Sequence, residues 1–197
     1  MPYQRPLEKE KGEFWVGNPW QFSTSGENLS CYETNGVHLN QGGGKFLDMS
    51  FVSGADSDGD GRTVVAWDIT QDGMPELLVR QAGGGALIVY RNRFPKASWL
   101  HVSLRGVKSN RLGIGAKVIA EAGGKRVCRE LYPVVNFLSQ SPAAVHLGLG
   151  DAKKVDRLTV RWPSGDEQVF KDVDVNRQLL IREGSSAPEV VTPGKAP

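Results

Sequence analysis

The chain has 197 residues, which is enough for one large or two small domains with a hydrophobic core. Its formal net charge is +2 because basic and acidic residues are nearly balanced, so the composition gives no support for nucleic-acid binding, which requires a concentrated basic face. No stretch is apolar over the roughly 18 residues that a membrane-spanning helix requires.

Residues 1–35 show no clear periodicity and are predicted to form an N-terminal arm. The apolar side chains of Trp15, Trp20 and Phe22 would anchor this arm on a folded body. The first residues, MPYQRPLEKEKGEF, lack the apolar stretch of a signal peptide. The chain is therefore expected to be cytoplasmic, a mature form, or a piece cut from a longer protein.

Short β-strands are predicted from residue 37 onward, because 24 glycines and 11 prolines divide the sequence into brief apolar segments. The clearest strand period is in WLHVSLRG, where Leu100, Val102 and Leu104 alternate with polar neighbours. Gly-Gly and Pro-Ser-Gly turns predict hairpins. No stretch of ten residues has helical spacing, so the predicted fold is all-β. The predicted strands lie in GVHLNQGGGKFLDMS, RTVVAWDI, PELLVRQ, ALIVYRN, WLHVSLRG, AKVIAEAGGKRVCRELY, AAVHLGLG, DRLTVRWPSGDEQVF and RQLLIRE.

The C-terminal residues 185–197 are rich in Pro and Ser and are predicted to form a disordered tail. The two cysteines, Cys31 and Cys128, lie far apart and outside any CxxC or Cys/His cluster, so a zinc site built on them is not expected. They would form one disulfide in a secreted protein or remain two buried thiols in a reducing compartment.

Two acidic loops are candidate metal sites. Calcium binds six to eight oxygen atoms, which alternating Asp side chains in a tight loop can supply. In DSDGDG, residues 56–61, Asp56, Asp58 and Asp60 have the spacing found at the start of such a loop. Trp67 stands where a helical calcium loop has its bidentate Glu, and predicted strands flank the loop, so an EF-hand is excluded.

The second acidic loop is DITQDGMPE. Its candidate ligands are the side-chain oxygens of Asp68, Thr70, Asp72 and Glu76 and the main-chain carbonyl of Met74. Three carboxylates make this a weaker set than a full calcium loop. The alternative for both acidic loops is a solvated polar turn, held by hydrogen bonds between Asp side chains and the backbone.

Residues 36–95 resemble one FG-GAP/VCBS repeat, through NGVHLNQGGGKFLDMS, GRTVVAWDITQDGMPELLV and ALIVYRN. Such repeats are blades of β-propellers, and the resemblance implies calcium binding by their D-x-D-x-D-G-x-x-D turn. This chain departs from the acidic pattern at Thr70 and Glu76. One blade cannot close a propeller, so its sheet is expected to pack on the following domain, on the N-terminal arm or on another chain.

Residues 96–184 resemble the ASPIC/UnbV domain, which follows such repeats in that family. The motifs that carry the resemblance are Ser109-Asn110-Arg111, Gly113-Ile114-Gly115-Ala116, Ser139-Gln140, His146-Leu147-Gly148-Leu149-Gly150 and Trp162-Pro163-Ser164-Gly165. They occur in the family's order and at about its spacing. The combined resemblance implies an all-β protein, in which one propeller-blade-like antiparallel sheet packs with a small β-sandwich or barrel-like domain.

The motif SNRLGIGA is interpreted as a structural loop. Asn110 tolerates unusual backbone angles, and the glycines permit another backbone to approach closely. Arg111 could pair with Asp151 or Asp156. Trp162, at the hairpin turn WPSG, is predicted to lie in the core rather than to bind a ligand.

The lead interpretation is a non-enzymatic, calcium-stabilised β module for protein or surface interaction, part of a larger assembly or chain. The resemblance implies an extracellular, periplasmic or cell-envelope location. The partner would be another protein chain, a copy of itself or a cell-surface component. The alternatives are a carbohydrate-binding module, in which Trp99 and Trp162 would stack on sugars, and an accessory protein or enzyme of natural-product biosynthesis.

No catalytic residue is predicted, and no cofactor other than calcium. The three histidines, His38, His101 and His146, lie on separate predicted strands, and their spacing identifies no nucleophile–base pair. The segment GLGD at residues 148–151 is not interpreted as a phosphate site, because no long helix is predicted after it.

Overall fold

Nearly all regular structure among the described residues is β, which confirms the predicted fold class. The one helix in the part of the chain that the structure describes is α2 (Ser50–Ser53). No helix there has the length and apolarity to cross a membrane. The computed structural model describes residues 34–59, 61–81, 86–134, 136–137 and 139–191.

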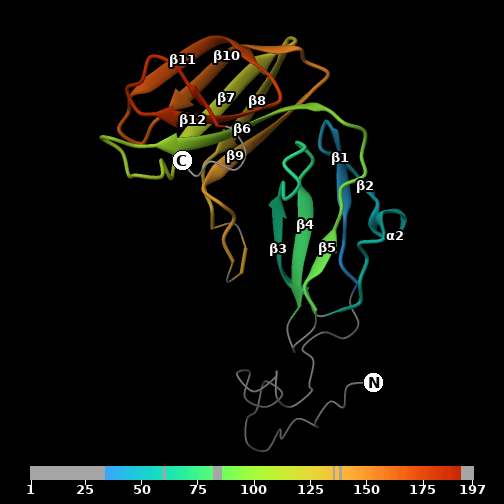
Figure 1. The fold of residues 1–197 in the computed structure, drawn as a ribbon. Helices are drawn as coiled ribbons and strands as arrows, with labels where there is room; N and C mark the ends of the chain where they lie inside the picture. The colour runs from blue at the N-terminus through green and yellow to red at the C-terminus, as the bar shows by residue number, and fades with distance from the viewer. Residues whose placement is uncertain (1–33, 60, 82–85, 135, 138, 192–197) are drawn as a thin grey trace, which may run out of the picture. The chain divides into compact units, whose positions relative to one another are not determined.

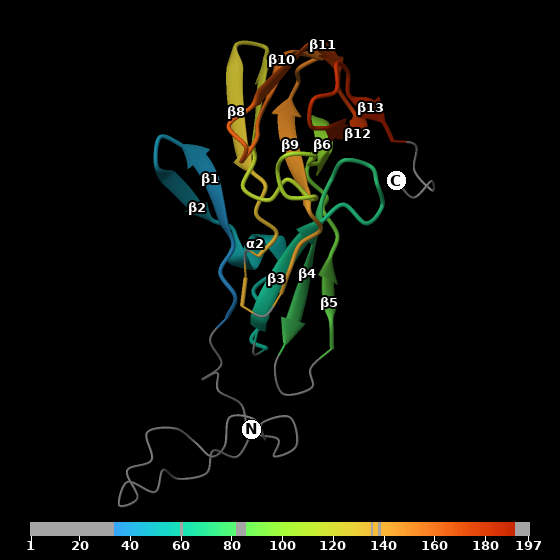
Figure 2. The same cartoon turned by 90° about the vertical axis from the view of Figure 1, so that its left-hand side faces the viewer.

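The chain divides into two compact units, whose strands are labelled in Figure 1, except β13, which is labelled in Figure 2. Unit 1 comprises Met1–Val65 and Leu77–Tyr90, and unit 2 comprises Ala66–Glu76 and Arg91–Pro197. The second acidic loop, which sequence analysis assigns to the repeat, thus groups with unit 2. The apolar anchors predicted for the N-terminal arm lie outside the described residues.

Unit 1 starts with an antiparallel hairpin, β1 (His38–Gly42) and β2 (Lys45–Asp48). The GGG turn predicted from the sequence joins these strands, and its glycines all have positive φ, a conformation that favours residues without a side chain. A three-stranded sheet follows in the order β3-β4-β5. Its strands are β3 (Gly61–Trp67), β4 (Glu76–Gln81) and β5 (Ile88–Tyr90).

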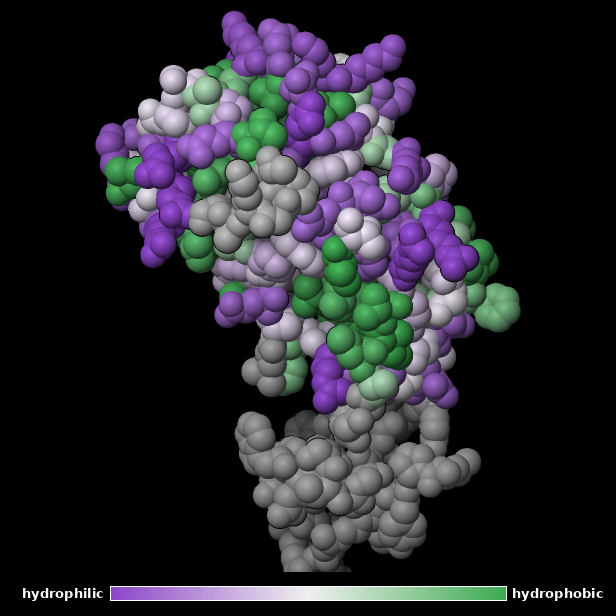
Figure 3. All heavy atoms as spheres, viewed as in Figure 1, coloured by the Kyte–Doolittle hydropathy of each residue, from purple (hydrophilic) through white to green (hydrophobic). Residues whose placement is uncertain are grey.

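The described residues of unit 1 form almost no hydrophobic core. Among its described residues, Ala55 is the only buried hydrophobic one. The side chains of β3 alternate between half-buried and exposed, so neither face of this strand is closed to water. Hydrophobic residues gather over β4 and β5 (Figure 3). The large hydrophobic side chains that unit 1 exposes are Leu39, Phe46, Leu47, Phe51, Val52, Val64, Leu87 and Val89.

Unit 2 contains two four-stranded sheets, ordered β11-β10-β7-β8 and β13-β12-β6-β9. The two predicted hairpins, β7–β8 and β10–β11, are antiparallel. The other pairs are also antiparallel except β6–β12, which is parallel. The strands are β6 (Ser98–Arg105), β7 (Lys117–Ala122), β8 (Lys125–Glu130), β9 (Ala144–Gly150), β10 (Lys154–Arg161), β11 (Glu167–Asp174), β12 (Arg177–Arg182) and β13 (Glu189–Val190).

One hydrophobic core draws side chains from both sheets of unit 2, which therefore form a β-sandwich. The alternation predicted for WLHVSLRG is confirmed, because Leu100, Val102 and Leu104 are buried and the residues between them are only half-buried. Leu147 on β9 and Leu158 on β10 are fully buried. Each such side chain stabilises the fold by about 1.5–3 kcal/mol when it leaves water.

The C-terminal segment differs from its prediction. Composition predicts disorder from residue 185, whereas Glu189 and Val190 form β13 and pair with Leu180 and Leu179 of β12. The amide of Val191 also donates to the carbonyl of Gln178 at 2.8 Å. The unpaired edge of β12 explains the difference, because it offers backbone partners to a short β-branched stretch inside a polar segment.

Candidate functional site

The second acidic loop leaves β3 and returns into β4 (Figure 2). Trp67 at its start and Gly73 in its middle both contact side chains of β6. The ring of Trp67 meets the ring of His101 edge-on, with centroids 4.9 Å apart and an interplanar angle of 71°. Gly73 has φ +86° and lies against the indole of Trp99, where a Cβ atom would overlap the ring. Only glycine satisfies both conditions without a shift of the loop.

Backbone amides inside this loop bind the predicted carboxylate ligands. The carboxylate of Asp68 accepts hydrogen bonds from the amides of Asp72 at 3.1 Å and Gly73 at 2.7 Å. The Asp72 carboxylate accepts from the Met74 amide at 3.0 Å, and the buried Glu76 accepts from the Ile69 amide at 3.0 Å. These are the contacts of a polar turn held by its own side chains.

The structure brings the predicted calcium ligands together only in part. Asp68, Asp72 and Glu76 share one loop, but no group of three or more His, Cys, Asp or Glu side chains among the described residues is arranged to hold a metal ion. In the first acidic loop Asp56 is half-buried and Asp58 is exposed. Asp60 lies outside the described residues, so the three candidate ligands of the first acidic loop cannot be compared as a group. The calcium assignment stays a prediction.

Two histidines that spacing alone does not connect face each other in the structure. His101 on β6 pairs directly with His146 on β9. The imidazole of His146 stacks on the indole of Trp99, with ring centroids 6.2 Å apart and an interplanar angle of 15°. The Nε2 atom of His101 and the Nδ1 atom of His146 are buried and have no hydrogen-bond partner. The alternation of side chains along each strand predicts that both rings lie on the outer face. It does not predict that β6 pairs with β9, which is what brings the two rings together.

Burial lowers the pKa of both imidazoles and so favours their neutral form. It lowers the pKa of His101, the neighbouring His146 lowers that pKa further, and the Asp68 carboxylate opposes the change. Burial also lowers the pKa of His146, against the opposing charge of Asp68, while Arg129 lowers it further. A neutral imidazole can offer one nitrogen lone pair to a ligand.

The predicted motifs around Ser109 and Ser164 meet at Glu183, a residue that sequence analysis missed. Its Oε2 atom accepts hydrogen bonds from the amides of Val107, Lys108 and Ser109, each at 2.7 Å. Its Oε1 atom accepts from the hydroxyls of Ser109 at 2.8 Å and Ser164 at 2.7 Å. Burial raises the pKa of Glu183, but these hydrogen bonds outweigh it and lower the pKa to about 2.

The structural interpretation of SNRLGIGA agrees with its contacts. The side-chain amide of Asn110 donates to the carbonyl of Ile114 and accepts from its amide, both at 2.8 Å. Gly113 has φ +67°, and a Cβ atom there would lie 2.8 Å from Cβ of Leu104. Arg111 is exposed, and among the described residues no ion pair joins it to Asp151 or to Asp156. That suggested pairing is wrong.

Neither tryptophan suggested for sugar stacking presents an open face. Trp162 is only 4% exposed, as predicted for a core residue, and its indole N–H donates to Gln168. Trp99 is 9% exposed, lies against Gly73 and stacks with His146. A sugar ring needs a free aromatic face for stacking, so these two residues give no support to carbohydrate binding.

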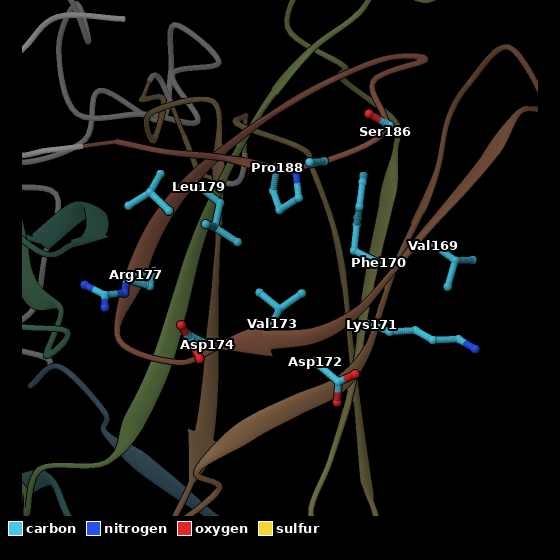
Figure 4. Close-up of a pocket in the computed structure, with 12 residues that line it drawn as sticks. Val169, Phe170, Lys171, Asp172, Val173, Asp174, Arg177, Leu179, Ser186 and Pro188 are labelled. Carbon is cyan, nitrogen blue, oxygen red and sulfur yellow. The ribbon is translucent and has the colours of Figure 1, made fainter.

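A hollow of about 360 Å³ lies among β11, β12 and β13. The side chains of Phe170, Val173, Leu179 and Pro188 surround it (Figure 4). Charged residues, among them Lys171, Asp174 and Arg177, also line it, so the hollow is of mixed polarity, and no histidine or cysteine is among the described residues that line it. Cys128 is exposed on β8, so the expectation of a buried thiol is wrong for this residue. Cys31 lies outside the described residues, and the disulfide stays a prediction.

Comparison with known proteins gives a family match for the larger part of unit 2. No curated protein matches the chain. The family described as ASPIC and UnbV matches residues 106–188, which confirms the resemblance of this segment, whereas the resemblance of residues 36–95 to an FG-GAP/VCBS repeat stays a prediction. The matched segment includes Ser109, Ser164 and Glu183. Residues 106–188 are therefore similar to the ASPIC and UnbV family.

Proposed function

We propose that this protein is a non-enzymatic β module that binds another protein chain through the exposed sheet of unit 1. The observation that carries the proposal is the near absence of a core among the described residues of that unit, where Ala55 alone is a buried hydrophobic residue. A small sheet whose apolar side chains remain open to water is marginally stable alone and gains stability when another surface covers it.

The exposed side chains are large enough to drive such binding. On the three-stranded sheet, Val64 of β3 is 40% exposed and Val89 of β5 is 50% exposed. Elsewhere in unit 1, Phe51 on α2 is 86% exposed and Phe46 on β2 is 62% exposed. Burying one Phe, Leu or Val side chain against a partner contributes about 1.5–3 kcal/mol before the cost of association. An exposed apolar patch, such as the one over β4 and β5 in Figure 3, is typical of an interaction surface.

The resemblance of residues 36–95 to a propeller blade supports a partner that is itself a β-sheet. Blades cover each other's faces and edges, and a lone blade leaves both open. We therefore expect the partner to present an antiparallel sheet with an apolar face. The same resemblance supports a location outside the cytoplasm, where calcium is abundant. No observation in the described residues favours an enzyme of natural-product biosynthesis.

Calcium stabilisation of the second acidic loop is part of this proposal. Oxygen donors alternate along the loop in the pattern that calcium prefers. The ion would be held by Asp68, Asp72 and Glu76, with the hydroxyl of Thr70 and the carbonyl of Met74. Each carboxylate has about four lone-pair sites, so the hydrogen bonds to backbone amides leave capacity for a cation. A bound ion would draw the ends of β3 and β4 together. Calorimetric titration of the protein with calcium tests this part.

Hydrogen exchange of the purified chain at rising protein concentration tests the interaction surface. We expect the amides of β3, β4 and β5 to exchange orders of magnitude faster than those of β6, β7 and β9, because only the latter strands cover a core. Mass spectrometry of peptides reports the exchange, and sedimentation velocity reports the mass at each concentration.

Three outcomes decide the proposal. Fast exchange of β3–β5 at every concentration would support a different protein as the partner. Protection that appears together with a doubled mass would support a second copy as the partner. Slow exchange in a monomer would contradict the proposal, because the chain would then cover its own sheet, for example with residues 1–33.

A further inference from the structure

The outer face of the β6–β9 pair holds two buried imidazole nitrogens that have no partner. His101 and His146 lie directly opposite each other in the register of the two strands. Directly paired residues of antiparallel strands have Cβ atoms about 4.5–5.5 Å apart. Two imidazole rings on such a pair can therefore turn their nitrogens toward one common point.

Leaving such nitrogens without a partner is costly. A buried polar atom that lacks a hydrogen bond loses about 1–3 kcal/mol relative to its hydrated state, so native proteins satisfy most of them. The Nε2 atom of His101 and the Nδ1 atom of His146 share this condition at neighbouring positions. A single bound species between them would satisfy both.

The surroundings favour a cation as that species. The carboxylate of Asp68 acts electrostatically on both imidazoles. The ring of Trp67 lies edge-on to His101, and the ring of Trp99 is stacked with His146, so two aromatic side chains flank the pair. Because neutral imidazole is a ligand for Zn²⁺, Cu²⁺ and Ni²⁺ and not for Ca²⁺, the chemistry of this pair differs from that of the acidic loop.

We propose that His101 and His146 bind one first-row transition metal ion such as Zn²⁺, with water molecules completing its coordination. Zinc binds imidazole nitrogen at about 2.0–2.1 Å, a distance that two facing rings on paired strands can reach. Asp68 contributes negative charge near the ion rather than a direct bond, since no group of three ligating side chains converges among the described residues. The ion would fasten β6 to β9. This site does not depend on the interaction surface of unit 1.

Zinc titration of the full chain with alkylated thiols tests this site. Alkylation removes Cys31 and Cys128 as competing ligands. Calorimetry at pH 7.5 should give one zinc ion per chain for the wild type. His101→Gln and His146→Gln should each weaken binding at least about tenfold, because each removes one of two protein ligands. His38→Gln, which alters the exposed third histidine on β1, is the matched control and should bind zinc as the wild type does.

NMR of the imidazole nitrogens gives a second measurement. If the two histidines were only structural, their nitrogen chemical shifts would not change on addition of zinc. On addition of zinc, the nitrogen resonances of His101 and His146 should shift, and those of His38 should not. Acidification below about pH 6 should release the ion, because protons compete for the same nitrogens. Far-ultraviolet dichroism of each variant verifies that it is folded before its affinity is compared.

Three results would overturn the proposal. The first is a wild-type protein that binds no zinc. The second is a His38→Gln variant that loses affinity as much as His101→Gln does. The third concerns Asp72→Asn, which alters the acidic loop but neither histidine: equal weakening by Asp72→Asn would place the zinc in that loop. Unchanged zinc affinity of Asp72→Asn with reduced calcium affinity would separate the two sites.

Discussion

At the scale of single residues, the Glu183 carboxylate holds two loops that are distant in sequence. It collects the amides of residues 107–109 on one oxygen and the hydroxyls of Ser109 and Ser164 on the other. The amide of Glu183 also donates to the carbonyl of Arg105 at 2.9 Å. The charged carboxylate thus fixes one end of the β6–β12 pair, where charge-assisted hydrogen bonds are stronger than neutral ones.

Protein stability should decrease as the pH falls from 4.5 toward 2. The pKa of Glu183 is lowered from 4.5 to about 2 in the folded protein, so the unfolded chain binds this proton more readily. The contribution of the carboxylate is therefore complete above about pH 4.5 and is lost progressively as the pH approaches 2. Urea unfolding at a series of pH values measures the free energy of unfolding.

Two variants isolate this effect. Glu183→Gln should lower the free energy of unfolding at pH 7 by about 1.5–3 kcal/mol, because the NH₂ group of glutamine would face amides and hydroxyls that are themselves donors. The variant should also show a flatter dependence of this free energy on pH below 4.5, because glutamine does not titrate. Glu130→Gln, at an exposed position on β8, should keep both the stability and the slope. A Glu183→Gln protein with the wild-type slope would refute the assignment.

At the scale of elements, the second acidic loop has two possible roles: a polar turn or a calcium site. Its docking by Trp67 and Gly73 is established by ring contacts and close approach. Its carboxylates already bind backbone amides. A cation would therefore add to an ordered loop, and its effect should show as extra stability rather than as the formation of the loop.

Chelation of calcium should lower the melting temperature by several degrees if the loop binds the ion, because a ligand held only by the folded state stabilises that state by mass action. Asp68→Asn should abolish the difference between calcium and chelator. Asp156→Asn, an exposed carboxylate on β10, should keep it. Identical melting curves with calcium and with chelator would leave the polar turn as the description of this loop.

The sequence predicted those elements whose partners lie nearby in the chain. The hairpins β1–β2, β7–β8 and β10–β11 follow from glycine-rich or Pro-Ser-Gly turns between apolar runs. The pairs β6–β9 and β6–β12 do not, since no local pattern states which distant strand a given strand will join. The facing imidazoles of His101 and His146 depend on such a pair.

Some features of the candidate site had no local signal. Glu183 follows the apolar run of β12 like any polar residue at a strand end, and only the tertiary fold brings Ser109 and Ser164 to it. The same holds for Val190, whose pairing with Leu179 depends on an open strand edge rather than on composition. In contrast, the alternation of Leu100, Val102 and Leu104 predicted their burial correctly.

At the scale of the whole molecule, the two units differ in what stabilises them. Unit 2 has a continuous core supplied by two sheets. Unit 1 has one buried hydrophobic residue among those described and exposes many others. Thermal stability of the isolated chain is therefore expected to reside in unit 2, and unit 1 is expected to depend on a partner.

A pair of leucine substitutions tests this difference. Leu147→Ala in the core of unit 2 should lower the free energy of unfolding by about 2–5 kcal/mol, because it removes a fully buried side chain and leaves a cavity. Leu47→Ala in unit 1, where the leucine is 50% exposed, should change it by less than about 0.5 kcal/mol. Chemical denaturation monitored by circular dichroism measures both. Comparable losses would show that unit 1 carries its own core.

The parallel pairing of β6 with β12 has a consequence for the newborn chain. In the sheet ordered β13-β12-β6-β9, β6 is made first and both of its neighbours are made later. While the ribosome adds the residues between β6 and β12, one edge of β6 has no hydrogen-bonding strand. Contacts between strands this distant in sequence form slowly. The nascent polypeptide must therefore keep an apolar strand soluble until β12 emerges, which makes this interval the stage at which a chaperone would have the most to shield.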